Sequence, residues 1–166
     1  DYHRYLQEGG LWDEIDLIDQ VREYRDQAPQ VYTDTLGAMA SNLDEEHHVT
    51  TWVGRHAVDT LESWEGGGNL LMASFIPPHH PYVPPAPWHK MYDPAALTML
   101  PGNAAQCDQS DLLYSRGFFP HDQWTDAQLR RVMAYYYASI SQIDHWAGQM
   151  IDTLRANSLY DDTVIV

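Results

Sequence analysis

The chain has 166 residues, with 24 Asp and Glu against 9 Lys and Arg, a formal net charge of −15 and 44% hydrophobic residues. That length suits one globular domain, which buries roughly 70% of its unfolded surface. The acidic balance excludes nucleic acid as an expected partner and disfavours an anionic membrane, because both bind clustered Lys and Arg. Since no apolar run reaches the roughly 18 residues of a membrane span, we expect a soluble chain.

The N-terminal part is the acidic part. Apolar residues between Tyr2 and Gln27 predict one or two short helices, interrupted at Gly9-Gly10. Residues 1–60 hold 13 acidic and 4 basic side chains, so they carry −9 of the total charge. We expect this segment to be a solvated surface, away from the histidine-containing loop described below.

A second helix is predicted from about Asp44 to Trp64, with Ser41 or Asn42 as the N-cap and Gly66-Gly67-Gly68 as the stop. Its predicted apolar face contains Val49, Trp52, Val53, His56, Ala57, Thr60, Leu61 and Trp64. We interpret His56 as a hydrogen-bonded core histidine rather than a ligand, and His47-His48 as exposed surface.

Two strands and a long helix follow. The apolar run Asn69–Ile76 predicts a buried strand, and Thr163–Val166 predicts another. Between them, helical spacing predicts a helix over Asp126–Ala156, with Thr125 and Gln128 as a capping box and Asn157 as the stop. This order favours a parallel α/β sheet, and because two strands do not make a stable sheet, we expect a fragment of a larger domain.

The segment Ile76–Pro94, called here the histidine loop, holds seven of the ten prolines and three of the nine histidines. Proline excludes helix and central strand, so the loop is expected to be stiff. His79 and His80 follow the predicted strand directly, at the end where parallel sheets bind ligands. The alternative is that they only decorate a rigid loop. Lys90, the only lysine, is a candidate for anion binding or a solvated side chain.

Metal and thiol chemistry find little support in the sequence. No two histidines of the loop have the spacing of a helical zinc pair. Cys107 is the single cysteine, which excludes an internal disulfide and a cysteine-rich zinc site and assigns no compartment.

The chain contains two ordered blocks of motifs. The first runs through Leu70–Phe75, Pro78-His79-His80-Pro81-Tyr82-Val83-Pro84-Pro85, Met91-Tyr92-Asp93-Pro94 and Leu100-Pro101. The second comprises Tyr135–Gly148 and Asp161–Val166. Together, in this order, they resemble the sulfatase family of the alkaline phosphatase superfamily. The resemblance covers residues 46–166 well and residues 1–45 weakly, so it implies an incomplete central portion of one catalytic domain. It also implies a three-layer α/β fold with a mostly parallel sheet and long flanking helices.

The resemblance implies an enzyme that cleaves sulfate esters with a formylglycine nucleophile and a Ca²⁺ or Mg²⁺ ion. The family's Cys/Ser-x-Pro-x-Arg motif is absent: Cys107 stands in Cys107-Asp108-Gln109-Ser110-Asp111. The nucleophile and the metal ligands are therefore expected outside these residues, and this chain alone is expected to bind no metal and to be inactive.

What carries over is His79, which matches the histidine of the family's Pro-His-x-Pro turn and is implied to be catalytic, assisting the departing alcohol. His80 is the alternative at that position and, with Lys90, a candidate substrate-binding residue. Asp144 matches a recurrent position on the long helix and is interpreted as structural, tying that helix to a loop. The implied partner is a small-molecule or glycan sulfate ester. Alternatives are a phosphonate monoester or phosphodiester hydrolase of the same superfamily, or a non-catalytic relative.

Overall fold

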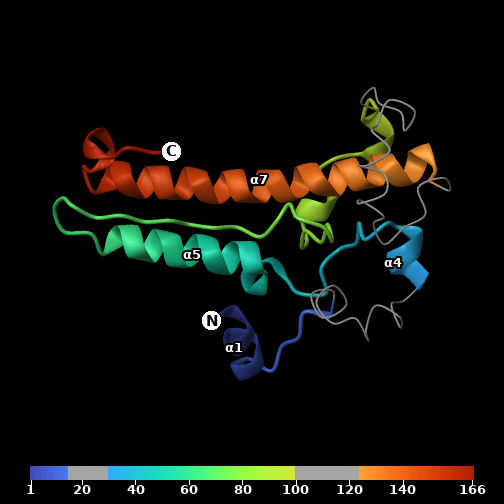
Figure 1. Ribbon diagram of the computed structural model, residues 1–166, viewed down its shortest axis with the longest axis horizontal. Helices are drawn as coiled ribbons and strands as arrows, with labels where there is room; N and C mark the ends of the chain where they lie inside the picture. The colour runs from blue at the N-terminus through green and yellow to red at the C-terminus, as the bar shows by residue number, and fades with distance from the viewer. Residues whose placement is uncertain (15–29, 100–123) are drawn as a thin grey trace, which may run out of the picture.

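The computed structural model describes residues 1–14, 30–99 and 124–166. Two helices dominate this part of the chain, α5 (Val49–Glu62) and α7 (Asp126–Ala156). They run side by side in the same direction, and smaller elements surround them (Figure 1). These are the helices α1 (Tyr2–Glu8) and α4 (Gln30–Asp34) and the 3-10 turns η1 (Glu45–His47), η2 (Trp88–Lys90), η3 (Pro94–Ala96) and η5 (Tyr160–Asp162).

Helix α7 confirms the predicted helix over residues 126–156. The Thr125 side chain accepts from the Gln128 amide while the Gln128 side chain accepts from the Thr125 amide, so the predicted capping box is present. Asn157 ends the helix and donates to the carbonyl of Leu61 at 3.2 Å. The C-terminal ends of α7 and α5 are thereby tied together.

The contact between α5 and α7 is made by small and polar side chains. Helix α5 buries Thr50, Thr51, Gly54, Ala57 and Leu61. A Cβ atom added to Gly54 would lie 2.1 Å from Cδ2 of Trp146, so glycine lets the indole of α7 approach the α5 backbone. Gln142 of α7 is fully buried here, and its Nε2 lies 3.5 Å from Thr51 Oγ1.

The start of α5 corrects the prediction for this helix. Neither Ser41 nor Asn42 is its N-cap: Asp44 caps the short turn η1, and His48 then caps α5. The buried face is also rotated, since His56 and Thr60 are exposed. His56 packs edge-on against the Trp52 ring at 4.3 Å and is not the core histidine that we expected.

The N-terminal helix is confirmed in its first part. Helix α1 ends before Gly9-Gly10, and Gly10 has a φ of +67°, a conformation that glycine adopts without strain. The second helix of the prediction falls mainly on residues 15–29, outside the described residues.

No β-ladder forms at the two predicted strands within the described residues. Residues 70–76 nevertheless alternate between exposed and half-buried positions, with Leu70 94% and Met72 86% exposed, as a strand covered on one face would do. Residues 163–166 run in the same direction (Figure 1). Both segments line an apolar hollow of about 570 Å³ beside α7. The alternation of exposed and half-buried residues is compatible with an α/β fold, but the sheet itself stays a prediction.

The histidine loop is anchored to the segment after α4 by a parallel bridge between Ala38 and Tyr82. The Tyr82 amide donates to the Gly37 carbonyl, the Met39 amide donates to the Tyr82 carbonyl at 3.0 Å, and Ser41 continues the pattern at Pro84. Arg131 of α7 donates to the Ala38 carbonyl at 2.7 Å. The loop is therefore an ordered structure connected to α7, as its prolines predicted. In the described residues, no helix is both long and apolar enough to cross a membrane.

Candidate active site

A cavity of about 300 Å³ lies at the start of the histidine loop. It brings together His79 and His80 from the loop, His48 and Val49 from the start of α5, and Ser139 from α7. The remaining lining residues are Tyr2, His3, Asp13, Ile76, Pro77, Pro81 and Val83. The size is in the lower range of small-molecule sites. Two of the predicted site residues therefore face one cavity.

His79 is exposed, and its ring orientation is fixed by a local hydrogen bond. Nδ1 lies 2.6 Å from the carbonyl oxygen of His80. Because a carbonyl oxygen only accepts, Nδ1 is the donor of this hydrogen bond. The bond orients the imidazole of His79, which lines the cavity.

His80 is held differently, by packing. Its ring lies edge-on to Tyr32 at 6.0 Å and to Tyr82 at 5.5 Å. A Cβ atom on Gly37 would lie 2.4 Å from His80 Nε2, so the imidazole occupies the space beside that glycine. Of the two neighbouring histidines, His79 is the exposed residue and His80 is half-buried.

His48 corrects the prediction that His47-His48 is exposed surface. Its side chain is buried, with 3% of the residue exposed. Nδ1 accepts from the Thr50 amide at 3.3 Å, and Nε2 donates to the Val83 carbonyl at 3.1 Å. Burial lowers the pKa of His48 from 6.5 to about 4, although the Val83 hydrogen bond opposes this shift. His48 is therefore a neutral imidazole that joins α5 to the histidine loop.

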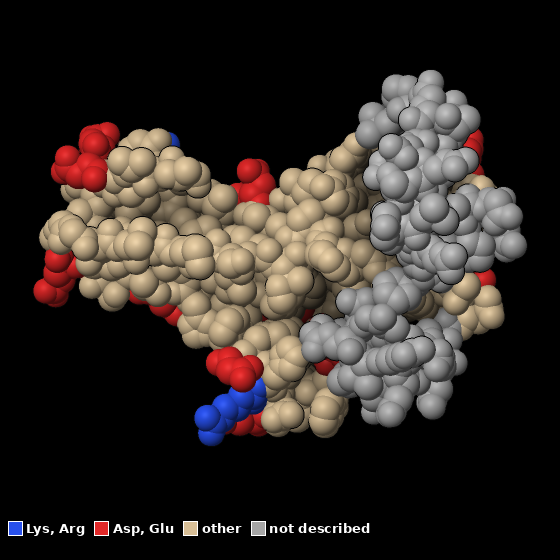
Figure 2. Space-filling model, in the orientation of Figure 1, with Lys and Arg blue, Asp and Glu red and all other residues tan. Residues whose placement is uncertain are grey.

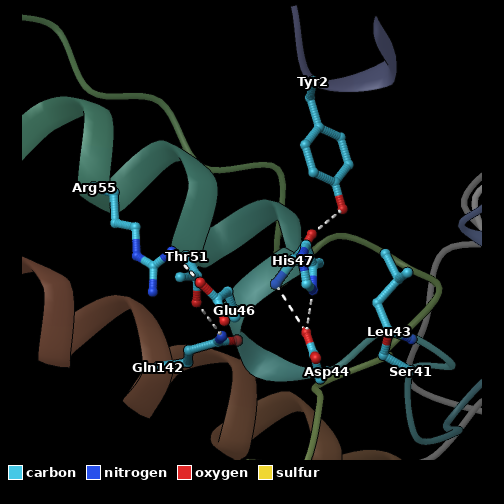
Figure 3. A network of polar contacts seen from close by, with 9 residues as sticks. All are labelled: Tyr2, Ser41, Leu43, Asp44, Glu46, His47, Thr51, Arg55 and Gln142. Carbon is cyan, nitrogen blue, oxygen red and sulfur yellow. Dashed lines mark hydrogen bonds and ion pairs between the residues drawn. The ribbon is translucent and has the colours of Figure 1, made fainter. Parts of the chain in front are cut away.

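The N-terminal segment also reaches the cavity, contrary to the expectation that this acidic part lies away from the histidine loop. Tyr2, His3 and Asp13 line the cavity. The Tyr2 hydroxyl donates to the carbonyl of His47 at 2.8 Å, as Figure 3 shows above the start of α5. Asn42 donates to the Trp12 carbonyl at 2.6 Å. The expectation failed because these long-range contacts leave no periodic pattern in the sequence.

Beside this contact lies a small network of polar side chains (Figure 3). Asp44 accepts from His47 Nδ1 at 2.6 Å, and this hydrogen bond lowers the pKa of the Asp44 carboxyl group. Arg55 pairs with Glu46 at 3.3 Å on the exposed side of α5. Both pairs are at least partly exposed to solvent, and exposed ion pairs contribute little to the free energy of unfolding.

The other predicted site residues lie elsewhere. Lys90 is exposed in η2 and does not line the cavity. Asp144 is exposed on α7, and its proposed structural role, tying that helix to a loop, stays a prediction. Cys107 falls in residues 100–123, outside the described residues.

On the face that Figure 2 shows, Asp and Glu side chains lie at the edges, and the described surface between them is largely uncharged. Among the lining residues of the cavity, Asp13 is the acidic one. In residues 1–14, 30–99 and 124–166, no group of three or more His, Cys, Asp or Glu side chains is placed to hold a metal ion. The described residues therefore do not fit the divalent ion that the family resemblance implies.

Comparisons with known proteins agree with the motifs. A choline-sulfatase of Rhizobium meliloti is 31% identical over 100 residues, 58% of this chain and 20% of that protein. A multifunctional alkaline phosphatase superfamily protein, PehA of Trinickia caryophylli, is 26% identical over 141 residues, 76% of this chain and 27% of that protein. An arylsulfatase of Clostridium perfringens is 28% identical over 130 residues, 74% of this chain and 26% of that protein. No protein-family model matches.

These matches confirm the resemblance to sulfatases of the alkaline phosphatase superfamily. The chain spans between 20% and 27% of the length of these three curated relatives. The chain therefore corresponds to about a quarter of the length of a whole relative.

Proposed function

We propose that this chain, as a relative of sulfatases within the alkaline phosphatase superfamily, is part of an enzyme that hydrolyses sulfate esters, with His79 as its proton donor. The observation that carries the proposal is the fixed orientation of His79. Its Nδ1 donates to the His80 carbonyl at 2.6 Å, and this exposed residue lines the cavity. A side chain held in this way can present Nε2 repeatedly in one direction.

The chemistry needs such a donor. When a nucleophile supplied by other residues of the protein bonds to sulfur, the bond between sulfur and the alcohol oxygen breaks and its electron pair stays on the departing oxygen. Protonated His79 gives the Nε2 proton to that oxygen, so that the product leaves as a neutral alcohol and His79 becomes neutral. Proton transfer by a positioned side chain typically contributes about 10²- to 10⁴-fold in rate.

His80 and Lys90 are assigned supporting roles. His80 lines the cavity beside His79, where it would contact the substrate. Lys90 lies on the same loop but outside the cavity, so it would act on an anionic substrate by charge at longer range. The substrate class is a small-molecule or glycan sulfate ester.

In sulfatases, formylglycine supplies the nucleophile and a Ca²⁺ or Mg²⁺ ion stabilises the charge on the ester. Neither group is assigned to the described residues of this chain. Both would come from other residues of the protein, and the contribution proposed for this chain is the histidine loop.

The test is turnover of an aryl sulfate by the full protein that contains this chain. We expect His79→Ala to lower kcat by about 10²-fold or more. His80→Ala should lower it less and should also lower the melting temperature, because the His80 ring packs between Tyr32 and Tyr82. His56→Ala, an exposed histidine on α5, is the matched control and should leave kcat unchanged. Equal and mild losses in His79→Ala and His80→Ala would contradict the assignment.

A second candidate is hydrolysis of a phosphonate monoester or phosphodiester. The observation that keeps it open is the match to PehA, described as a multifunctional alkaline phosphatase superfamily protein, which covers 76% of this chain, close to the 74% covered by the arylsulfatase. Phosphate and sulfate esters are both tetrahedral anions, so the same histidine could serve either. The ratio of kcat/KM for a phenylphosphonate monoester and for an aryl sulfate on one preparation distinguishes the two.

A further inference from the structure

His48 has a position that none of the roles above explains. It is nearly fully buried, it borders the cavity that contains His79, and both of its ring nitrogens are hydrogen-bonded. Each bond goes to a different part of the chain: one to Thr50 in the first turn of α5, the other to Val83 in the histidine loop. The side chain is therefore a bridge between two elements that meet at the cavity.

The bond to Val83 completes the support of the histidine loop. Along an extended segment, successive backbone groups point to opposite sides. The Tyr82 and Pro84 carbonyls accept from Met39 and Ser41 on one side. The Val83 carbonyl lies between them in sequence, and His48 Nε2 donates to it at 3.1 Å. Residues 82–84 are consequently held by the segment after α4 and by His48 together.

This support continues to His79 over a short stretch of chain. His79 donates its backbone amide to the Ile76 carbonyl, and its ring donates to the His80 carbonyl. His80 in turn packs against Tyr82, within the residues that are held. A shift of residues 82–84 would therefore move the carbonyl that orients the His79 ring.

We propose that His48 is a positioning residue, which fixes the histidine loop relative to α5 and thereby holds His79 in its working orientation. The inference rests on the proposed function of His79 for its catalytic consequence. Its structural part, the tether from α5 to the loop, can be measured without any activity.

The two bonds of His48 can be removed separately. In His48→Asn, the side-chain oxygen takes the place of Nδ1 and keeps the helix cap, since Asn is among the best N-cap residues, but the side chain is too short to reach Val83. In His48→Gln, the terminal amide takes the place of Nε2 and can still donate to Val83, while the helix cap is lost. If His48 only stabilised the fold, kcat would fall in proportion to the melting temperature in both His48→Asn and His48→Gln.

The experiment uses the full protein with both variants and with His56→Asn as a control on the exposed side of α5. Hydrogen exchange of residues 76–87 is measured alongside kcat, KM and the melting temperature. For His48→Asn we expect faster exchange in the loop by about three- to tenfold, the effect of one lost hydrogen bond on local opening. We also expect a kcat lower by about 10- to 100-fold, little change in KM, and an almost unchanged melting temperature.

For His48→Gln we expect a lower melting temperature, with loop exchange and kcat close to those of the unchanged protein. The proposal is overturned if loop exchange in His48→Asn equals that of the His56→Asn control, or if kcat in both His48 variants falls only in step with the melting temperature. If the unchanged protein does not hydrolyse the aryl sulfate at all, the function proposed above fails. The exchange data then still decide whether His48 tethers the loop.

Discussion

Acidification should destabilise the chain through His48. The pKa of this histidine is lowered by burial from 6.5 to about 4, so between these values the unfolded chain binds a proton that the folded chain does not. Stability therefore rises with pH across this window: it is complete above about pH 6.5 and falls steadily toward pH 4. Integrating the difference in bound protons gives a loss of about 2 kcal/mol between pH 7.5 and pH 5, and about 3 kcal/mol once both states are protonated.

The assay is urea unfolding of the 166-residue chain at pH 7.5 and pH 5, followed by tryptophan fluorescence, for the unchanged chain and for His48→Asn. Asparagine keeps the cap of α5 and does not titrate, so the variant should lose about 2 kcal/mol less than the unchanged chain over this pH range. The lowered pKa of Asp44 acts only below about pH 4, where its hydrogen bond to His47 is lost, and does not interfere. An equal pH effect on both proteins would refute the buried, neutral state of His48.

Three further predictions concern other contacts. Gly54→Ala should lower the free energy of unfolding by about 1–3 kcal/mol in urea titration, because its Cβ would lie 2.1 Å from the Trp146 ring, whereas Gly67→Ala, in open space, should have a much smaller effect. Tyr2→Phe removes the donor to the His47 carbonyl and should loosen α1, although the ring contact with Trp52 stays, and residues 1–14 should be cleaved several-fold faster by protease with α7 unaffected; unchanged cleavage would contradict the contact. Lys90→Ala in the full protein should raise KM for an aryl sulfate modestly, and more at low than at high salt; a salt-independent KM would exclude a charge effect of Lys90 on substrate binding.

Local signals in the sequence were sufficient for the long helix. The bounds of α7 follow from the Thr125–Gln128 capping box and from regular apolar spacing, both of which depend on neighbouring residues only. The ordered backbone of the histidine loop agrees with its prolines, and its stiffness stays a prediction. Both elements could be predicted because the residues that determine their conformation are close to them in the sequence.

The orientation of α5 could not be predicted in the same way. Ala57 and Leu61 of the predicted face are buried, but Thr50 and Gly54 complete the buried stripe where large apolar side chains such as Trp52 were expected. Small residues at helical spacing were the available signal, and they allow the close approach of Trp146. A search for apolar periodicity overlooks such small residues, because it measures hydrophobicity and not how closely a partner helix can pack.

The sequence identified some residues of the candidate site and missed others. His79 and His80 were identified from their place after a predicted strand and from the resemblance to a family. His48 and Tyr2 were not, because their roles depend on partners 35 and 45 residues away in the chain. At Leu70 and Met72 the sequence predicts a strand, and the described residues show its alternating exposure without a β-ladder, so the strand stays a prediction.

The dependence of rate on the leaving group tests the central claim most directly. The full protein and its His79→Ala variant are compared on a series of aryl sulfates whose phenols range from acidic to weakly acidic, and log kcat/KM is plotted against the pKa of the phenol. If His79 gives its proton to the departing oxygen, the variant loses little on the most acidic phenols and about 10²- to 10⁴-fold on the least acidic, so its line is steeper. Two parallel lines would contradict a proton-donating role for His79.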